Sequence, residues 1–139
     1  MSFIFSYDGL LDVTHGCTGI TLSNNHIHDH FKASLVGHSD SNAAEDTAIR
    51  VTYFNNFFEN LNSRGPSFRF GQGHLFNNIY NNVSDGINTR QGAQLLVENN
   101  VFVDSKKALF STDAGFAVAI GNGEPSTFAC IFTSDTNSI

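Results

Sequence analysis

Pairs of adjacent asparagines recur along this chain at a nearly constant interval, and they limit the folds that it can adopt. Successive pairs are separated by 31, 22 and 22 residues, and a further step of 22 reaches Asn122; the pairs are Asn24-Asn25, Asn55-Asn56, Asn77-Asn78 and Asn99-Asn100. Each pair ends a short segment in which apolar and polar residues alternate, which indicates strands rather than helices. A repeat of this length built from short strands indicates a solenoid of stacked units.

Each repeat is interpreted as a strand, a sharp asparagine turn and a second strand. Asparagine tolerates the left-handed conformation that a tight turn requires, and stacked amide side chains can hydrogen-bond along the stack. The longer interval needs extra residues, and the polar segment 38–46 predicts a loop that holds them. We therefore expect an all-β, right-handed, single-stranded parallel β-helix of about six coils.

The size and charge of the chain limit its organisation and its partners. A chain of 139 residues predicts a single domain over residues 1–139. The net charge of −6 argues against general nucleic-acid binding, which needs a basic surface. No apolar run reaches the ~18 residues of a membrane-spanning helix, and the first residues lack the basic segment of a signal peptide. We expect neither nucleic-acid nor membrane partners.

Two arginines flank a turn in the middle of the chain. Arg64 precedes the pair Gly65-Pro66, which marks a turn. Arg69 lies in an alternating run in which Phe68 and Phe70 share one face. If the phenylalanines belong to the core, Arg69 points outward.

Five sequence blocks, in a fixed order, carry a resemblance to a known family. They are Asp8-Gly9-Leu10-Leu11-Asp12, the block from His28 to Asp40, the block from Arg50 to Asn56, the block from Asn62 to Gly71, and the block from Asp85 to Arg90. From Tyr7 to roughly Ala119 the sequence resembles the calcium-dependent pectate lyases of polysaccharide lyase family 1. The resemblance implies a secreted enzyme that cleaves de-esterified polygalacturonate, the acidic backbone of pectin, by β-elimination.

The resemblance also implies a role for each site residue. Asp8 and Asp12 fall on two of the family's calcium-binding carboxylates, and Lys32 and Arg69 fall on cations that bind the substrate. Arg64 falls on the catalytic general base.

Elementary chemistry agrees with these roles. Calcium prefers oxygen ligands, above all carboxylates, and a polyanion requires a cationic cleft. Because arginine is normally charged, its use as a base predicts an alkaline optimum.

The sequence departs from the family pattern at both ends. The resemblance implies a third calcium carboxylate, further coils and a capping helix before Tyr7, none of which is present here, and residues 120–139 form a divergent tail. Fewer carboxylates predict weaker calcium binding. Uncapped coil ends expose strand edges and apolar side chains. We therefore expect a homo-oligomer formed through the segments Phe3-Ile4-Phe5 and Phe128–Phe132.

Two other functions compete with a calcium-dependent lyase. A catalytically weak or inactive remnant would still bind pectin, and a pectin lyase would act on the methyl-esterified polymer. Asp8, Asp12 and Lys32 argue against a pectin lyase, because that relative replaces the calcium carboxylates. His28, His30 and His38 resemble metal ligands, yet we expect structural roles for them. We also expect Asp85 and Arg90 to make structural hydrogen bonds rather than to contact substrate.

Overall fold

The computed structural model describes residues 2–3 and 8–123, and these form three parallel sheets. Sheet A has five strands, which are β1 (Ser2–Phe3), β3 (His26–Lys32), β6 (Phe57–Ser63), β9 (Ile79–Val83) and β12 (Val101–Val103). Sheet B has four, which are β4 (Leu35–Val36), β7 (Ser67–Arg69), β10 (Asp85–Arg90) and β13 (Lys107–Ser111). Sheet C has five, which are β2 (Ile20–Ser23), β5 (Arg50–Phe54), β8 (Gln72–Phe76), β11 (Gln94–Glu98) and β14 (Phe116–Ile120).

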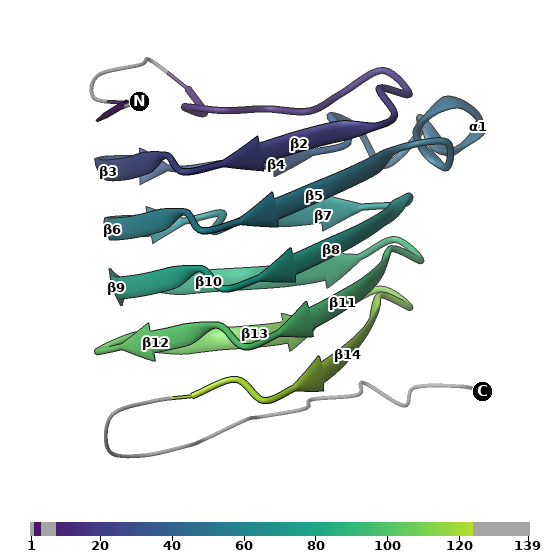
Figure 1. The fold of residues 1–139 in the computed structure, drawn as a ribbon. Coiled ribbons are helices and arrows are strands. Elements are labelled where there is room, and N and C mark those ends of the chain that lie inside the picture. Colours follow the sequence, from purple (N-terminus) through teal and green to yellow (C-terminus); the bar gives the residue numbers. More distant parts are fainter. Residues whose placement is uncertain (1, 4–7, 124–139) are drawn as a thin grey trace.

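The chain visits sheets C, A and B in turn and then starts the next coil one level further along the stack (Figure 1). This arrangement is a parallel β-helix, which confirms the predicted fold. The described residues give four coils with a strand in every sheet and a single strand beyond them at each end, compared with about six coils expected. Residues 8–19 explain part of the difference, because they contain no strand: they bond to the connection after β3 and to β4 and form only an isolated bridge, from Val13 to Val36.

The asparagine pairs form the turns between sheets C and A. The first residue of each pair is left-handed, with φ between 52° and 56°; these residues are Asn24, Asn55, Asn77 and Asn99. The second residue of each pair turns inward. Its Oδ1 accepts bonds of 2.9–3.1 Å from the backbone and side-chain amides of the asparagine one coil earlier, along the series Asn25, Asn56, Asn78, Asn100 and Asn122. The predicted amide ladder is therefore present and satisfies buried backbone groups.

A second column of left-handed residues lies five positions after the first, within or directly after the strands of sheet A, and the sequence pattern had not indicated it. Its members also have positive φ, from 49° to 53°; they are Asp29, Asn60, Asn82 and Asp104. Their side chains bond in part along the stack, since Asn60 Nδ2 donates to Asp29 Oδ1 and Asn82 Nδ2 donates to Asn60 Oδ1, each at 2.9 Å. The same spacings of 31, 22 and 22 were available in the sequence.

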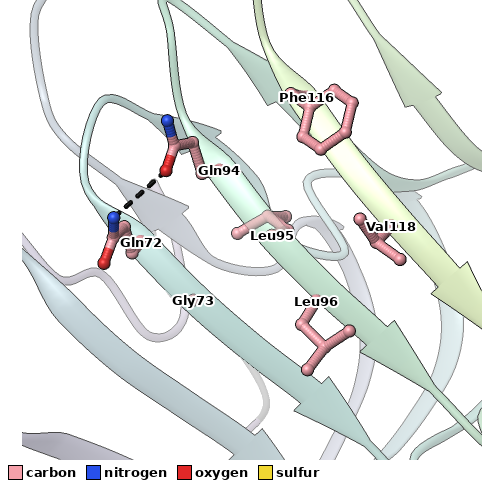
Figure 2. Close-up of a pocket in the computed structure, with 7 residues that line it drawn as sticks. All are labelled: Gln72, Gly73, Gln94, Leu95, Leu96, Phe116 and Val118. Carbon is pink, nitrogen blue, oxygen red and sulfur yellow. Dashed lines mark hydrogen bonds between the residues drawn. The ribbon is translucent and has the colours of Figure 1, made fainter.

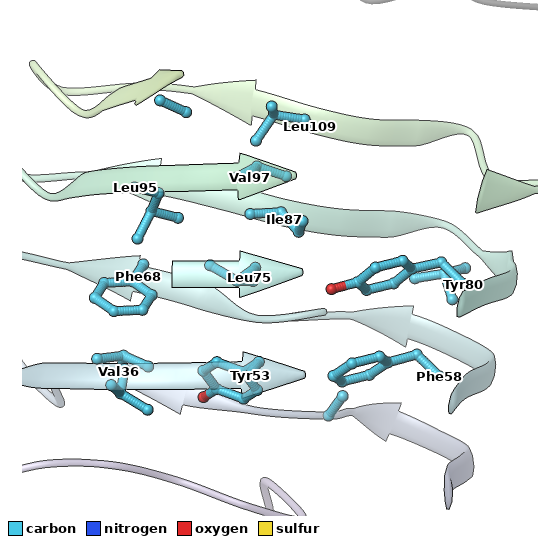
Figure 3. Close-up of a cluster of buried hydrophobic side chains, with 14 of the residues drawn as sticks. Val36, Tyr53, Phe58, Phe68, Leu75, Tyr80, Ile87, Leu95, Val97 and Leu109 are labelled. Atoms are coloured by element: carbon cyan, nitrogen blue, oxygen red, sulfur yellow. The ribbon is translucent and has the colours of Figure 1, made fainter. Parts of the chain in front are cut away.

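Inward-pointing apolar side chains stack in register along the axis of the solenoid (Figure 3). One column places the rings of Phe58, Tyr80 and Phe102 on one another with centroids 4.7 and 4.6 Å apart. Each of these rings is buried. Gly73 completes the core next to Phe68, because a Cβ at Gly73 would lie 2.7 Å from that ring. Stacking and burial of this kind supply most of the stability of a solenoid.

The extra residues of the longest repeat form a structured loop that includes the short helix α1 (Ala43–Asp46). Asp46 is fully buried, and its Oδ1 accepts the backbone N–H of Gly16 at 3.0 Å. Its Oδ2 lies 3.8 Å from Nδ1 of His38. These contacts fasten the loop to the segment that precedes β2 in the previous coil.

The Tyr80 hydroxyl is buried and has no hydrogen-bond partner among the described residues, and burial raises its pKa well above the ordinary value. An unsatisfied buried hydroxyl is destabilising. We therefore expect Tyr80→Phe to increase the free energy of unfolding by about 1 kcal/mol, measured by urea denaturation. The matched variant Tyr53→Phe, which loses a 2.8 Å bond to Ser34 Oγ, should decrease it. A decrease for Tyr80→Phe would contradict the prediction.

The segments expected to mediate self-association lie mainly outside the described residues, which exclude residues 4–7 and 124–139. The homo-oligomer therefore remains a prediction. Among the described residues, the outer face of β14 exposes Phe116, Val118 and Ile120. No helix in this part of the chain has the length and apolar character needed to span a membrane.

Candidate active site

Arg64 lies in the turn from sheet A to sheet B, between β6 and β7. Its backbone is left-handed, with φ of 63°, and its carbonyl accepts the N–H of Ser34 at 2.8 Å. The next residue, Gly65, donates its N–H to the Gly86 carbonyl at 2.9 Å. Bonds to the coils before and after thus fix the turn, and the Arg64 side chain is 23% exposed.

Lys32, at the end of β3, and Arg64 meet at the carboxylate of Asp8. Lys32 Nζ donates to Asp8 Oδ1 at 2.9 Å, and Arg64 Nη1 lies 3.9 Å from the same oxygen. The hydrogen bond from Lys32 and its charge hold the pKa of Asp8 below the usual value. Three residues from different blocks of the sequence are therefore in one cluster, as the predicted roles require.

Asp12 lies beside this cluster. Its Oδ1 accepts the backbone N–H of Leu35 at 2.8 Å, and the carboxylate folds over Gly9, where a Cβ would lie 2.3 Å from that oxygen. This close approach explains the glycine that follows Asp8. Loss of hydration raises the pKa of Asp12, and the charge of Asp8 adds to the increase, whereas the Leu35 amide and the charges of Arg64 and Lys32 oppose it.

Arg69 projects from the outer side of β7, as expected, while Phe68 and Phe70 are buried. Its guanidinium forms an ion pair through Nε with Asp40 and donates from Nη1 to the carbonyl of Gly37 at 2.8 Å. These partners come from the loop between β4 and α1. They leave the Arg69 side chain only 12% exposed.

Arg90 extends the cationic surface by one coil. It pairs with Arg69 in the parallel register of β10 and β7. Its Nε is buried without a hydrogen-bond partner among the described residues. Burial lowers the pKa of Arg90, and the neighbouring charges of Arg69 and Arg64 lower it further. A structural hydrogen bond was expected for Arg90, and at Nε it is absent among the described residues.

The histidines and Asp85 have nearby partners in the protein. Nδ1 of His28 lies 2.8 Å from Asp29 Oδ2, and Nε2 of His30 lies 2.7 Å from the Asp8 carbonyl oxygen. Asp85 lies 3.5 Å from Lys107 Nζ. In the described part of the chain, no group of three or more His, Cys, Asp or Glu side chains is arranged to hold a metal ion.

A groove of about 410 Å³ lies on the outer face of sheet C, away from these residues (Figure 2). An amide pair, Gln72 Nε2 to Gln94 Oε1 at 3.1 Å, borders it on one side. The groove is lined by Gln72, Gly73, Gln94, Leu95, Leu96, Phe116 and Val118. None of its lining residues carries an ionisable side chain, in contrast to the cluster at the turn from sheet A to sheet B.

Comparison with known proteins identifies the family to which this chain belongs. A family model described as pectate lyase matches residues 4–129. The chain is 67% identical to pectate lyase A of Aspergillus niger over 117 residues, which are 84% of this chain and 36% of that protein. The chain belongs to the pectate lyase family. It spans little more than a third of the length of these curated relatives.

Solved structures of pectate lyases share the fold. A Bacillus species pectate lyase, solved in complex with trigalacturonate, superposes with a TM-score of 0.77 and 31% identity, covering 96% of this chain and 46% of that one. Pectate lyase C from Erwinia chrysanthemi, solved at pH 9.5 with 30 mM Ca²⁺, gives a TM-score of 0.70 and 33% identity, covering 82% and 33%.

Proposed function

We propose that this chain cleaves de-esterified polygalacturonate by calcium-assisted β-elimination, with Arg64 as the general base. The observation that carries the proposal is the convergence of Arg64 and Lys32 on Asp8, with Asp12 beside them. Such a site combines cations that bind uronate carboxylates with oxygen ligands for a divalent ion. The relatives solved with trigalacturonate and with Ca²⁺ support this substrate class and this metal.

In the proposed reaction Arg64 removes the proton from the carbon next to the uronate carboxyl group. The electron pair left behind forms a carbon–carbon double bond, the bond to the glycosidic oxygen breaks, and the leaving oxygen takes up a proton from solvent. Lys32 and Arg69 bind carboxylates of the polymer, and Arg90, with its unpaired buried Nε, adds a further cation to the cleft. These charges stabilise the negative charge that develops on the carboxyl group.

Asp8 and Asp12 fit a calcium ion as part of its ligand set. Both are carboxylates, and loss of hydration raises the pKa of Asp12, which is consistent with a carboxylate that a bound cation would stabilise in its charged form. Water and substrate carboxylates would supply the remaining oxygens, because calcium takes six to eight. When bound, the ion supplies charge stabilisation to the substrate carboxylate. We also propose that the protein acts outside the cell, where its polymeric substrate lies.

The test is turnover of polygalacturonate, followed by the ultraviolet absorbance of the unsaturated product. A lyase should act on polygalacturonate faster than on highly methyl-esterified pectin, and the opposite preference would favour a pectin lyase. Binding of oligogalacturonates without any unsaturated product would instead identify a pectin-binding remnant.

Calcium should stimulate turnover, and excess chelator should remove the stimulation. Asp12→Asn is expected to weaken the apparent calcium affinity ~10-fold or more, because ligand charge sets affinity. The affinity should also fall as pH is lowered towards the raised pKa of Asp12, since protonation removes a ligand. Undiminished turnover in chelator would contradict the metal assignment. Asp104→Asn, at an exposed turn position outside the cluster, is the matched control.

A further inference from the structure

The loop between β4 and α1 contacts the outer side of sheet B through the carboxylate of Asp40, which pairs with Arg69. We propose that Asp40 is a positioning residue, which fixes the Arg69 guanidinium in the orientation that binds a substrate carboxylate. The inference deepens the proposed function and rests on it, because it assumes that Arg69 binds the polymer.

Two acceptors from the loop hold one side of the Arg69 guanidinium. Asp40 pairs with Nε, and the Gly37 carbonyl accepts from Nη1 at 2.8 Å. A guanidinium has five N–H donors in a planar fork, so these contacts leave donors for a ligand. The Asp40 side chain is 60% exposed, whereas Arg69 is 12% exposed. The carboxylate therefore fixes an enclosed arginine from the solvent side.

The loop is fastened so that it can hold this position. Gly37 has φ of 76°, and a Cβ there would lie 2.9 Å from the Cβ of Arg69, so only glycine allows the approach. Behind the loop, the buried Asp46 carboxylate accepts the N–H of Gly16 and faces His38. Asp40 is thus carried by a segment that is anchored on both sides of it.

Two physical effects give Asp40 a role in binding. A free arginine side chain must lose rotamer freedom when it binds, whereas Arg69 is already ordered by its partners. Arg69 also faces the like charge of Arg90 one coil further on. Asp40 offsets this repulsion, and its ion pair with Arg69 lowers its own pKa, so it stays charged across the working range.

The experiment compares Asp40→Asn and Asp40→Ala with the parent on polygalacturonate. Both should raise KM about 10-fold and change kcat less than about twofold, since Asp40 does not touch the reacting atoms. On an Arg69→Ala background, Asp40→Ala should have no further effect, because a residue that acts only through Arg69 has nothing left to position. Asp104→Asn should leave KM unchanged. Additive effects of the two substitutions, or an unchanged KM in both Asp40 variants, would overturn the proposal.

A second measurement does not depend on turnover. The Nε–H of Arg69 should give a slowly exchanging resonance in NMR spectra of the parent chain, and Asp40→Asn should accelerate its exchange ~10-fold or more. Unchanged exchange would overturn the positioning role even if the chain is an active lyase. If the parent forms no unsaturated product but Asp40→Asn accelerates exchange of the Arg69 Nε–H, the proposed lyase activity is wrong and the contact that orders Arg69 is confirmed.

Discussion

Replacing Arg64 with lysine or alanine is expected to reduce kcat on polygalacturonate by ~10²–10⁴, the usual effect of losing a positioned proton-transfer group. Lysine keeps the charge but not the reach or the planar fork of arginine, so it should not restore the rate. The fold should survive, because the turn at Arg64 is held through its backbone: the carbonyl accepts the Ser34 N–H, and Gly65 bonds to the next coil.

The control for this experiment is Arg50→Lys, at an exposed arginine on sheet C whose Nη1 donates to two carbonyls of its own loop. It should retain the parent's rate. Unfolding curves that coincide for parent and variants would exclude a loss of structure. Turnover by a well-folded Arg64→Ala protein within about a factor of two of the parent would be incompatible with a general base at this position.

Asn78→Ala is expected to lower the free energy of unfolding by ~3–5 kcal/mol, because it removes four bonds from the buried ladder. Asn78 Oδ1 accepts the backbone and side-chain amides of Asn56, each at 3.0 Å, and Nδ2 donates to the Tyr53 carbonyl at 3.0 Å and to Asn100 Oδ1 at 2.9 Å. Alanine would leave the buried backbone N–H of Asn56 without its acceptor and would remove one partner from each of the other groups. A domain with a total stability of ~5–15 kcal/mol would lose a large part of it.

Urea denaturation measures this change, and Asn81→Ala is the matched control. Asn81 lies in β9, three residues after Asn78, and makes one side-chain bond, to Glu59 Oε1 at 3.2 Å. Its replacement should cost about 1 kcal/mol or less. If Asn78→Ala costs no more than Asn81→Ala, the ladder does not stabilise the solenoid as argued here.

The repeat could be predicted because its causes are local and occur once in every coil. Left-handed turns select asparagine at one position, and stacking selects it again at the next, so the pattern is visible at Asn55-Asn56 and at each later pair. The second left-handed column, at Asp29 and Asn60, follows the same rule, but its mixed residue types hide the repeat in the sequence. The described residues contain fewer coils than the six expected, in part because residues 8–19 use chain length without contributing a strand.

By itself, the sequence determined the parallel β-helix, its asparagine ladder and the set of charged residues that should share a site. Only the tertiary structure decided which charges touch. It placed Lys32 and Arg64 on Asp8, enclosed Arg69 with Asp40 from a loop 29 residues earlier, and left the Arg90 Nε without a partner in the described chain. Period and turn chemistry act between neighbours in the chain or in the stack. The ion pair of Arg69 and its burial depend on the path of the loop between β4 and α1, which lies outside the repeat, so the repeat pattern cannot predict them.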